Sequence, residues 1–398
     1  MWRLSRAIVV GISVATLAIG ALVGNASVFA EPQATAVGSA STSLPAPVPL
    51  RLQETTQLDS TAPNFSLNYP KCDSDGNVFV QFGNYDAVRG QAQLDPAISE
   101  VIPDSKRVVV HRVQALSSSD YPNPRLTSFG VSRDGVVYAL VSTRRNASDG
   151  EPAKNEYYVE QLKEDITADV MTHLQDPPGA AHWSANLLGA FPKGNFLIAG
   201  ESSEEAGRPG PGSWRPFTAI YDSSGRFLIE LTLPEDVVNN FSKYTGSANG
   251  TAAATQPPKP HEYLGISIRS GGIVSGPDGN LWILRASEPL RLYAVDAAGQ
   301  VVKHVQFSPP VAGLTPSQFG FVGPEQIFID FAYVATDSSP HSGPSEIIGV
   351  FDIGTEQFNA LYAMPSTRGF LGCADGRGGF MYVGSTPDDR LALFYFRQ

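Results

Sequence analysis

Cysteine, methionine, tryptophan and positive charge are all scarce in this sequence of 398 residues, which contains two cysteines, four methionines and four tryptophans. Two cysteines are too few for a disulfide-rich scaffold or for a structural zinc site built from cysteines. Lys and Arg number 28 against 39 Asp and Glu, so the net charge is -11. An acidic surface repels phosphate backbones, and no basic stretch interleaved with aromatics offsets it, so we expect no nucleic-acid partner.

The short motifs that accompany common chemistries are also absent. The sequence has no G-x-S-x-G nucleophile turn, no C-x-x-C pair, no P-loop and no dinucleotide fingerprint. His261-Glu262 starts like the zinc-binding helix of a metalloprotease, but Gly265 stands where the second histidine is required. The turn at residues 73–77 resembles a calcium loop, but its glycine comes too early for an EF-hand. The sequence therefore assigns no catalytic residue, metal ion or cofactor.

The N-terminal residues have the layout of an export signal. Residues 1–30 combine a basic start, an uncharged and mostly apolar run, and small residues before Glu31. The apolar run is long enough for an uncleaved anchor, so cleavage and anchoring both remain open. Residues 31–63, rich in Ala, Ser, Thr and Pro, are predicted to be a disordered tether that includes a candidate closing strand. We expect an exported protein (periplasmic, secreted or membrane-tethered) whose only membrane contact is this anchor.

Six copies of one short pattern divide residues 64–398, the predicted folded domain. In each copy a turn rich in Asp, Gly or Asn precedes a run of β-branched and aromatic residues. Asp-Gly and Gly-Asn pairs supply the positive φ angles of tight hairpins. A repeated unit too small to bury its own face indicates a radial or linear array. The runs begin at Val78, Val136, Phe196, Leu281, Ile327 and Phe380.

Most of these hairpins are followed by a second hairpin, so each repeat is predicted to contain four antiparallel strands. Residues 219–229 and 292–302 are examples of the second hairpin. Four-stranded sheets stacked radially are the blades of a β-propeller. The sequence predicts an all-β, six-bladed β-propeller. Its apolar runs, among them residues 78–80, 136–138 and 281–284, are expected to line the centre.

The chain resembles the six-bladed propellers of the NHL and TolB-like superfamily over about residues 63–398. One blade, GIVSGPDGNLWI at residues 272–283, is similar to the repeats of streptogramin lyases. The resemblance implies the scaffold. The other five repeats depart from the lyase pattern, so the catalytic His and Glu of that family are not assigned to residues of this chain.

The last repeat lacks a strand, because only one apolar run, residues 391–396, follows its inner hairpin. An unpaired outer edge favours aggregation, so an N-terminal strand is expected to close the ring, with residues 50–52 as the candidate. Cys72 and Cys373 hold equivalent places in the first and last repeats, where a disulfide would lock the ring in an oxidising compartment. The alternative is two buried thiols that lie too far apart to bond.

Loop lengths distinguish the two ends of the predicted propeller. Long loops on a rigid scaffold are where binding residues gather, so function is assigned to the long-loop rim. Two arginines there could hold a carboxylate, a tryptophan could stack on a ring, and His261-Glu262 could act as a base or ligand. The alternative for each is a structural or solvated side chain. The candidate ligand-binding residues are Arg144, His182, Trp183, Glu201, His261, Glu262, Arg269 and Arg285.

These features favour a monomeric binding or interaction module whose partner is a small molecule or another protein. The alternative is a propeller enzyme of lactonase or lyase type. That enzyme would hold a divalent metal at the channel mouth with at least three Asp, Glu, Asn or His side chains from different blades. A third interpretation is a structural envelope protein with an exposed apolar patch on its outer strands.

Overall fold

All described residues belong to one compact unit, residues 44–398, and they are strands and turns apart from one short 3-10 helix. No helix among them is long and apolar enough to cross a membrane. The predicted signal or anchor and most of the predicted tether lie outside the described residues. The computed structural model describes residues 46–61, 65–86, 91–94, 97–116, 124–145, 154–162, 170–207, 213–231, 268–286, 289–333, 346–365, 369–375, 378–388 and 390–398.

A repeated aspartate turn explains why the strands start where they do. In the turn after β14, the Asp222 carboxylate accepts hydrogen bonds from the backbone N–H groups of Ser224 (2.9 Å) and Arg226 (3.0 Å). Gly225 has a φ of 79°, which a residue with a side chain rarely adopts. These bonds hold the chain in a tight reversal between two antiparallel strands. Equivalent aspartates with the same backbone contacts are Asp73 and Asp296.

The first three sheets follow one another along the chain. In spatial order, the first contains β3 (Phe65–Cys72), β4 (Val78–Asp86), β6 (Ala97–Ile102) and β7 (Arg107–Arg112), with β5 (Gln91–Leu94) on β4, and the helix Gln114–Leu116 follows it. The second contains β8 (Arg125–Val131), β9 (Val137–Arg145), β10 (Lys154–Leu162) and β11 (Val170–His173). The third contains β12 (His182–Ala190), β13 (Phe196–Ser203), β14 (Arg215–Tyr221) and β15 (Phe227–Glu230).

The largest sheet has nine strands and is open. One part contains β16 (Ile268–Ser275), β17 (Leu281–Arg285), β18 (Leu290–Val295) and β19 (Val301–Phe307). The other contains β20 (Leu314–Gly323), β21 (Gln326–Tyr333), β22 (Glu346–Asp352), β23 (Gln357–Ala363) and the short β1 (Val48–Pro49). A single parallel bridge, between Gly271 and Gln318, joins these two antiparallel groups. The sheet is therefore two four-stranded units that touch at one point, with β1 added at the far edge.

The last sheet combines the two ends of the described chain. It contains β24 (Gly369–Ala374), β25 (Phe380–Ser385), β26 (Arg390–Arg397) and, on the outside, β2 (Arg51–Thr61). β2 pairs antiparallel with β26, and Leu52 of the predicted closing segment lies opposite Phe396. The strand that completes this sheet is thus residues 51–61, all within the predicted tether, and it extends beyond the predicted closing segment 50–52.

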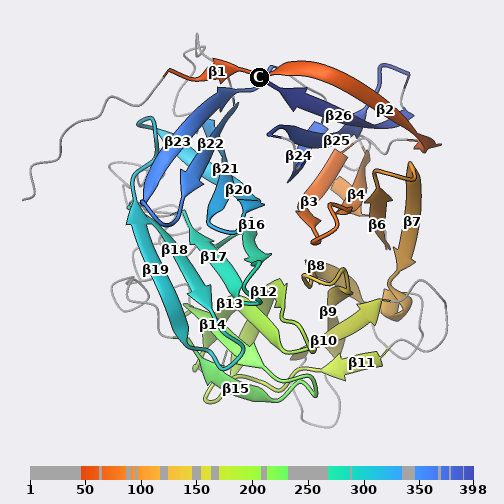
Figure 1. Cartoon of the computed structure of the whole chain (residues 1–398). Helices are drawn as coiled ribbons and strands as arrows, with labels where there is room; N and C mark the ends of the chain where they lie inside the picture. Colours follow the sequence, from red (N-terminus) through yellow and green to blue (C-terminus); the bar gives the residue numbers. More distant parts are fainter. Residues whose placement is uncertain are drawn as a thin grey trace, which may run out of the picture. The chain divides into compact units, whose positions relative to one another are not determined.

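The sheets succeed one another around a common centre, with β3, β8, β12, β16, β20 and β24 facing it (Figure 1). The innermost strands contact one another across this centre, as β16 does with both β3 and β8. The expectation that the apolar runs line the centre is wrong, because β4, β9 and β17 are each second in their sheet. Those strands are apolar on both faces because their neighbours are other sheets.

The hydrophobic core lies between successive sheets. Five clusters of buried side chains each combine residues from two neighbouring sheets, as Phe79 and Phe129 do for the first and second sheets. A sixth cluster lies between the two parts of the nine-stranded sheet. The last sheet packs against the first in the same way, through Met381 and Val78. The prediction of an all-β, propeller-like fold with four-stranded antiparallel sheets is confirmed.

Candidate functional site

Polar side chains cross the centre and bond to backbone carbonyls of other sheets. The Ser275 hydroxyl lies 3.0 Å from Val131 O and 3.1 Å from Ala190 O. The Gln318 amide donates to Leu371 O at 2.9 Å. Carbonyls of innermost strands have no further strand to pair with, so these side chains satisfy acceptors that would otherwise lie unpaired in the centre.

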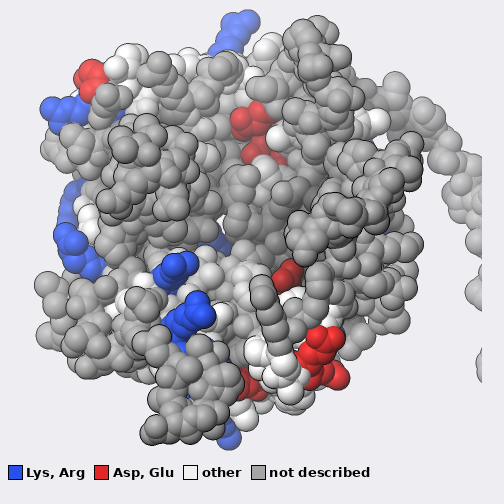
Figure 2. Space-filling view, turned by 180° about the vertical axis from the view of Figure 1, so that it is seen from behind, with Lys and Arg blue, Asp and Glu red and all other residues white. Residues whose placement is uncertain are grey.

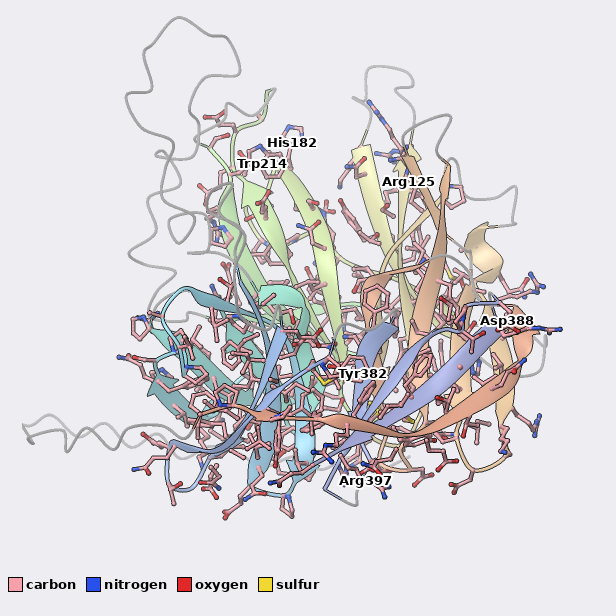
Figure 3. The ribbon with its side chains drawn as sticks, turned by 90° about the horizontal axis from the view of Figure 1, so that it is seen from above. Arg125, His182, Trp214, Tyr382, Asp388 and Arg397 are labelled. Carbon is pink, nitrogen blue, oxygen red and sulfur yellow. A yellow bond between two sulfur atoms is a disulfide. The ribbon has the colours of Figure 1, made fainter. Side chains whose placement is uncertain are left out.

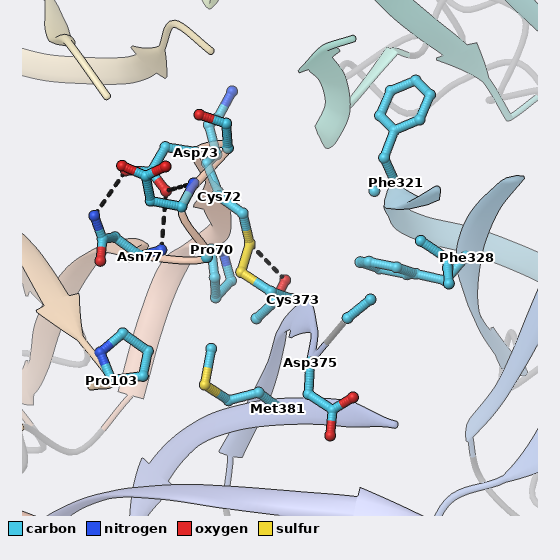
Figure 4. A pocket seen from close by; sticks show the side chains of 18 of the residues that line it. Pro70, Cys72, Asp73, Asn77, Pro103, Phe321, Phe328, Cys373, Asp375 and Met381 are labelled. Carbon is cyan, nitrogen blue, oxygen red and sulfur yellow. Dashed lines mark hydrogen bonds between the residues drawn. A yellow bond between two sulfur atoms is a disulfide. The ribbon is translucent and has the colours of Figure 1, made fainter. Parts of the chain in front are cut away.

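A cavity of about 640 Å³ opens beside these bonds. It is lined by strand residues of the first, nine-stranded and last sheets, by the turns that follow β3, β16 and β24, and by Arg133 in the turn after β8. We call this end of the molecule the Asp-turn end. Figure 4 shows Phe321 and Phe328 on one side of the cavity and Asp73 and Asn77 across from them. The cavity therefore combines an aromatic wall with a polar turn.

Two carboxylates at the cavity mouth, Asp73 and Asp375, are bonded to their own turns. Asp73 accepts from the backbone N–H groups of Asp75 and Asn77, each at 2.9 Å. Asp375 accepts from Gly379 N at 2.8 Å and pairs with the Arg397 guanidinium at 2.8 Å. These acids stabilise the mouth of the cavity.

Among the residues that the structure describes, Lys71 is the one lysine whose side chain reaches the centre. It follows Pro70 near the end of β3, and its Nζ lies 3.3 Å from Ile273 O and 3.5 Å from Leu188 O. Nζ also lies 5.7 Å from the centre of the Phe129 ring. Desolvation by burial lowers the pKa of Lys71 to about 8. The residue is nevertheless only half-buried, because the cavity reaches it.

The disulfide Cys72–Cys373 borders the same cavity. It joins β3 of the first sheet to β24 of the last, with the two Cα atoms 6.1 Å apart, and the chain has no free cysteine. Figure 4 shows it between the turn of Asp73 and the side chain of Met381. The bond fixes the innermost strands of these two sheets beside Lys71.

A second buried polar cluster lies between the nine-stranded and last sheets. The Ser317 hydroxyl donates to Asp330 Oδ2 at 2.6 Å, and the Tyr382 hydroxyl donates to Glu346 Oε1 at 2.5 Å. Burial raises the pKa of Asp330 well above its ordinary value, and the neighbouring Glu346 charge raises it further. Burial also raises the pKa values of Glu346 and Tyr382. Two acids this close in a low dielectric favour sharing a proton.

Arg144 lies at the other end of the molecule, where the long connections begin. It is exposed on β9 and lines a cavity of about 540 Å³ together with Arg125 and Asn155. Arg125 is paired with Ser142, two residues before Arg144, so both arginines lie on one face of the sheet. Figure 3 places Arg125 and His182 at this end and Arg397 at the opposite end. Two guanidinium groups on one face can hold an anionic group.

His182, Trp183 and Glu201 lie on the neighbouring strands β12 and β13. His182 Nε2 lies 2.7 Å from Gly207 O. The Trp183 ring is 4% exposed and packs on Tyr157, while its Nε1 donates to Asp176 at 3.0 Å. Trp183 is thus part of the core between the second and third sheets. Burial raises the pKa of Glu201.

Of the remaining candidates, only Arg285 has a described side chain, and it does not join this group. Arg285 lies on β17 of the nine-stranded sheet and is 1% exposed, so it belongs to the interior. The backbone of Arg269 lies in β16, and its side chain is outside the described part of the chain. His261 and Glu262 also lie outside the described residues. Figure 2 shows the long-connection end, where described basic and acidic side chains form separate small groups.

Two further expectations concern metals and apolar surface. Among the described residues, no group of three or more His, Cys, Asp and Glu side chains could hold a metal ion. Large exposed apolar side chains occur on outer strands, and they are Leu52, Val110, Leu228, Ile229, Val301 and Val302.

The sequence-based expectation missed both central features. Lys71 stands in a polar stretch, Asn68 to Ser74, that the repeat pattern does not mark. Asp330 interrupts an otherwise apolar run from Ile327 to Phe331, and this was the signal that could have found it. A carboxylate inside a fully buried strand requires compensation, so such an interruption is informative.

No protein-family model matches this sequence, and no curated protein matches it. Among solved structures, the chain is similar to a protein of unknown function from Dyadobacter fermentans, with 10% identity over 87% of this chain and 99% of that chain and a TM-score of 0.48. It is also similar to a luciferin-regenerating enzyme, with 10% identity over 87% of this chain and 95% of that chain and a TM-score of 0.46. Hydrazine synthase of Kuenenia stuttgartiensis shows 11% identity over 82% of this chain and 78% of that chain, with a TM-score of 0.38. Similarities at this level carry no argument about activity.

Proposed function

We propose that the chain is a six-bladed propeller of the NHL and TolB-like type, closed by β2. The nine-stranded sheet then counts as two blades that touch at the Gly271–Gln318 bridge. The antiparallel pairing of β2 with β26 supports closure, as does the cluster that packs the last sheet on the first. A closed ring leaves no long unpaired edge at the join.

This propeller binds a small molecule in the cavity at its Asp-turn end. The observation that carries the proposal is the cavity itself, about 640 Å³ in volume and lined by strands of the first, nine-stranded and last sheets. Sites for small molecules have volumes of roughly 300–1,000 Å³ and combine apolar walls with a few polar groups. Here the wall is Phe319, Phe321 and Phe328, and the polar group at depth is Lys71. The proposed site is therefore at the end of the molecule opposite the long connections.

The protein acts outside the cytoplasm as a monomer. The layout of residues 1–30 supports export. The Cys72–Cys373 disulfide supports it independently, because such bonds persist in oxidising compartments. Alkylation of thiols in intact cells, followed by mass spectrometry, tests this: both cysteines stay unmodified until a reductant is added. Sizing by light scattering tests the monomer.

The binding site is tested with the fluorescent probe anilinonaphthalene sulfonate, an aromatic anion small enough for the cavity. Asp75 and Ala298 hold the same position in two Asp turns, and only Asp75 lines the cavity. Asp75→Trp therefore narrows the mouth, while Ala298→Trp places the same bulk on an exposed turn away from it. We expect one probe molecule per chain, with binding weakened by Asp75→Trp and unchanged by Ala298→Trp. Equal binding by both variants, or no binding by the wild type, would contradict the site.

A further inference from the structure

The position of Lys71 is unusual for a lysine because, among the described residues, its amine is held by backbone carbonyls and not by an acidic side chain. Both of its hydrogen-bond acceptors are backbone carbonyls, Leu188 O and Ile273 O, on two different sheets. The stem reaches them from β3, and Phe129 of the second sheet flanks the nitrogen. Residues of four strands therefore fix where Nζ lies.

The protonation state of this amine follows from its surroundings. Desolvation is the cause of its lowered pKa, about 8 against an ordinary 10.5. A neutral amine has two N–H groups and one lone pair. The two carbonyls can accept both hydrogens, so the neutral form keeps its bonds and its lone pair stays available for reaction. At neutral pH such an amine contains a neutral fraction roughly a hundred times that of a surface lysine.

The surroundings also favour reaction with a carbonyl group. Lys71 lines the cavity, so a ligand on the aromatic wall of Phe319 and Phe321 lies in the same space. The two cysteines of the chain form a disulfide, so no thiol competes for an electrophile. Desolvation activates a lysine amine as a nucleophile, and burial supplies it at Lys71.

We propose that Lys71 binds an aldehyde or ketone ligand covalently and reversibly, as an imine, within the cavity of the proposed small-molecule site. The lone pair of Nζ attacks the carbonyl carbon and gives a carbinolamine. In forming the carbinolamine, one amine hydrogen moves to the carbonyl oxygen and makes it a hydroxyl group. The hydroxyl group and the remaining N–H hydrogen then leave as water, and the C=N bond forms. No oxidant or reductant is required, and hydrolysis releases the ligand. The inference rests on the proposed function and names its ligand class.

Reductive trapping tests the imine. The full chain is incubated with benzaldehyde and sodium cyanoborohydride at neutral pH, and the modified lysines are identified by peptide mass spectrometry. Lys106 lines the same cavity but is exposed, which makes it the internal control. We expect Lys71 to be labelled about tenfold faster than Lys106 or more, because its neutral fraction is larger. Labelling of Lys71 no faster than that of Lys106 would overturn the proposal.

Variants separate failure of the imine from failure of the site. Lys71→Arg keeps a cationic donor for the two carbonyls but cannot form the imine, whereas Lys106→Arg leaves the reactive amine intact. We expect loss of the trapped adduct in Lys71→Arg and its retention in Lys106→Arg. Asp75→Trp slows trapping by blocking access. If the fluorescent probe binds but no adduct forms at Lys71, the imine is wrong and the site stands. If neither occurs, both are wrong.

Discussion

Cys72 and Cys373 are bonded across 301 residues of sequence, and they join the innermost strands of the first and last sheets. The same two sheets are also joined by a buried cluster that contains Val78 and Met381. A disulfide and a hydrophobic interface therefore both connect the first sheet to the last. The bond restricts the unfolded chain far more than the folded one, because it closes a long loop.

Removal of this disulfide is predicted to destabilise the protein by about 2–5 kcal/mol. In thermal unfolding, the variant Cys72→Ala/Cys373→Ala should melt well below the wild type. A reductant should lower the melting temperature of the wild type to that of the variant and leave the variant unchanged. A wild type insensitive to complete reduction would show that the bond adds nothing to the join.

Leu58 and Leu52 offer a matched test of whether β2 belongs to the last sheet. Leu58 is 1% exposed in the cluster shared with the first sheet, whereas Leu52 is 50% exposed. Leu58→Ala is expected to lower the free energy of unfolding by about 2–5 kcal/mol, because it leaves a cavity in a packed core. Leu52→Ala should stay within about 0.5 kcal/mol of the wild type. Denaturant titration measures the free energy of unfolding of both variants. If Leu58→Ala lost no more stability than Leu52→Ala, β2 would lie outside the core.

The fold could largely be predicted from the sequence because its turns repeat. Asp73, Asp222 and Asp296 start tight hairpins through their own backbone contacts, which is a local effect that sequence spacing reveals. Which strand faces the centre could not be predicted, because an apolar run fits equally well between sheets and around a hub. The structure places polar residues such as Ser275 and Gln318 in the centre instead.

The central cavity could not be predicted for a different reason. The amine of Lys71 is held in the centre by the carbonyls of Leu188 and Ile273, which lie 117 and 202 residues away in the sequence. The sequence pattern marks the neighbouring Cys72 and the turn at residues 73–77, but not Lys71 itself. Loop length predicted a site at the other end of the molecule, where Arg144 and Arg125 line a second cavity. Trp183, which the sequence suggested as a stacking platform, packs within the core.

The Asp330 and Glu346 pair predicts a pH dependence of stability. Burial raises the pKa of Asp330, so the folded protein keeps this proton at pH values where the unfolded chain has lost it. The resulting stability is fully present below pH of about 4 and is lost as the pH rises through the raised pKa. Asp330→Asn should therefore gain stability relative to the wild type as the pH rises. The gain is about 1.4 kcal/mol for each unit by which the pKa is raised.

Urea denaturation of the wild type and Asp330→Asn at pH 4 and pH 8 measures this difference. Tyr382→Phe is the companion variant, because it removes the hydroxyl that donates to Glu346 and leaves both carboxyl groups in place. It should lower stability by about 1–2 kcal/mol, and a loss of stability with rising pH should persist because Asp330 stays buried. A constant difference between the wild type and Asp330→Asn across this range would show that Asp330 keeps an ordinary pKa.

Gly271 sets how closely the two halves of the nine-stranded sheet approach. It pairs with Gln318, and a Cβ at Gly271 would lie 2.3 Å from Gln318 Cβ and 3.0 Å from Ser317 O. Gly271→Ala should thus push β16 from β20 and cost about 1–3 kcal/mol, as overpacking does. Gly323→Ala is the control, because a Cβ there meets nothing within 4 Å. Equal unfolding midpoints for the two variants in denaturant would mean that the bridge tolerates a wider gap than its geometry indicates.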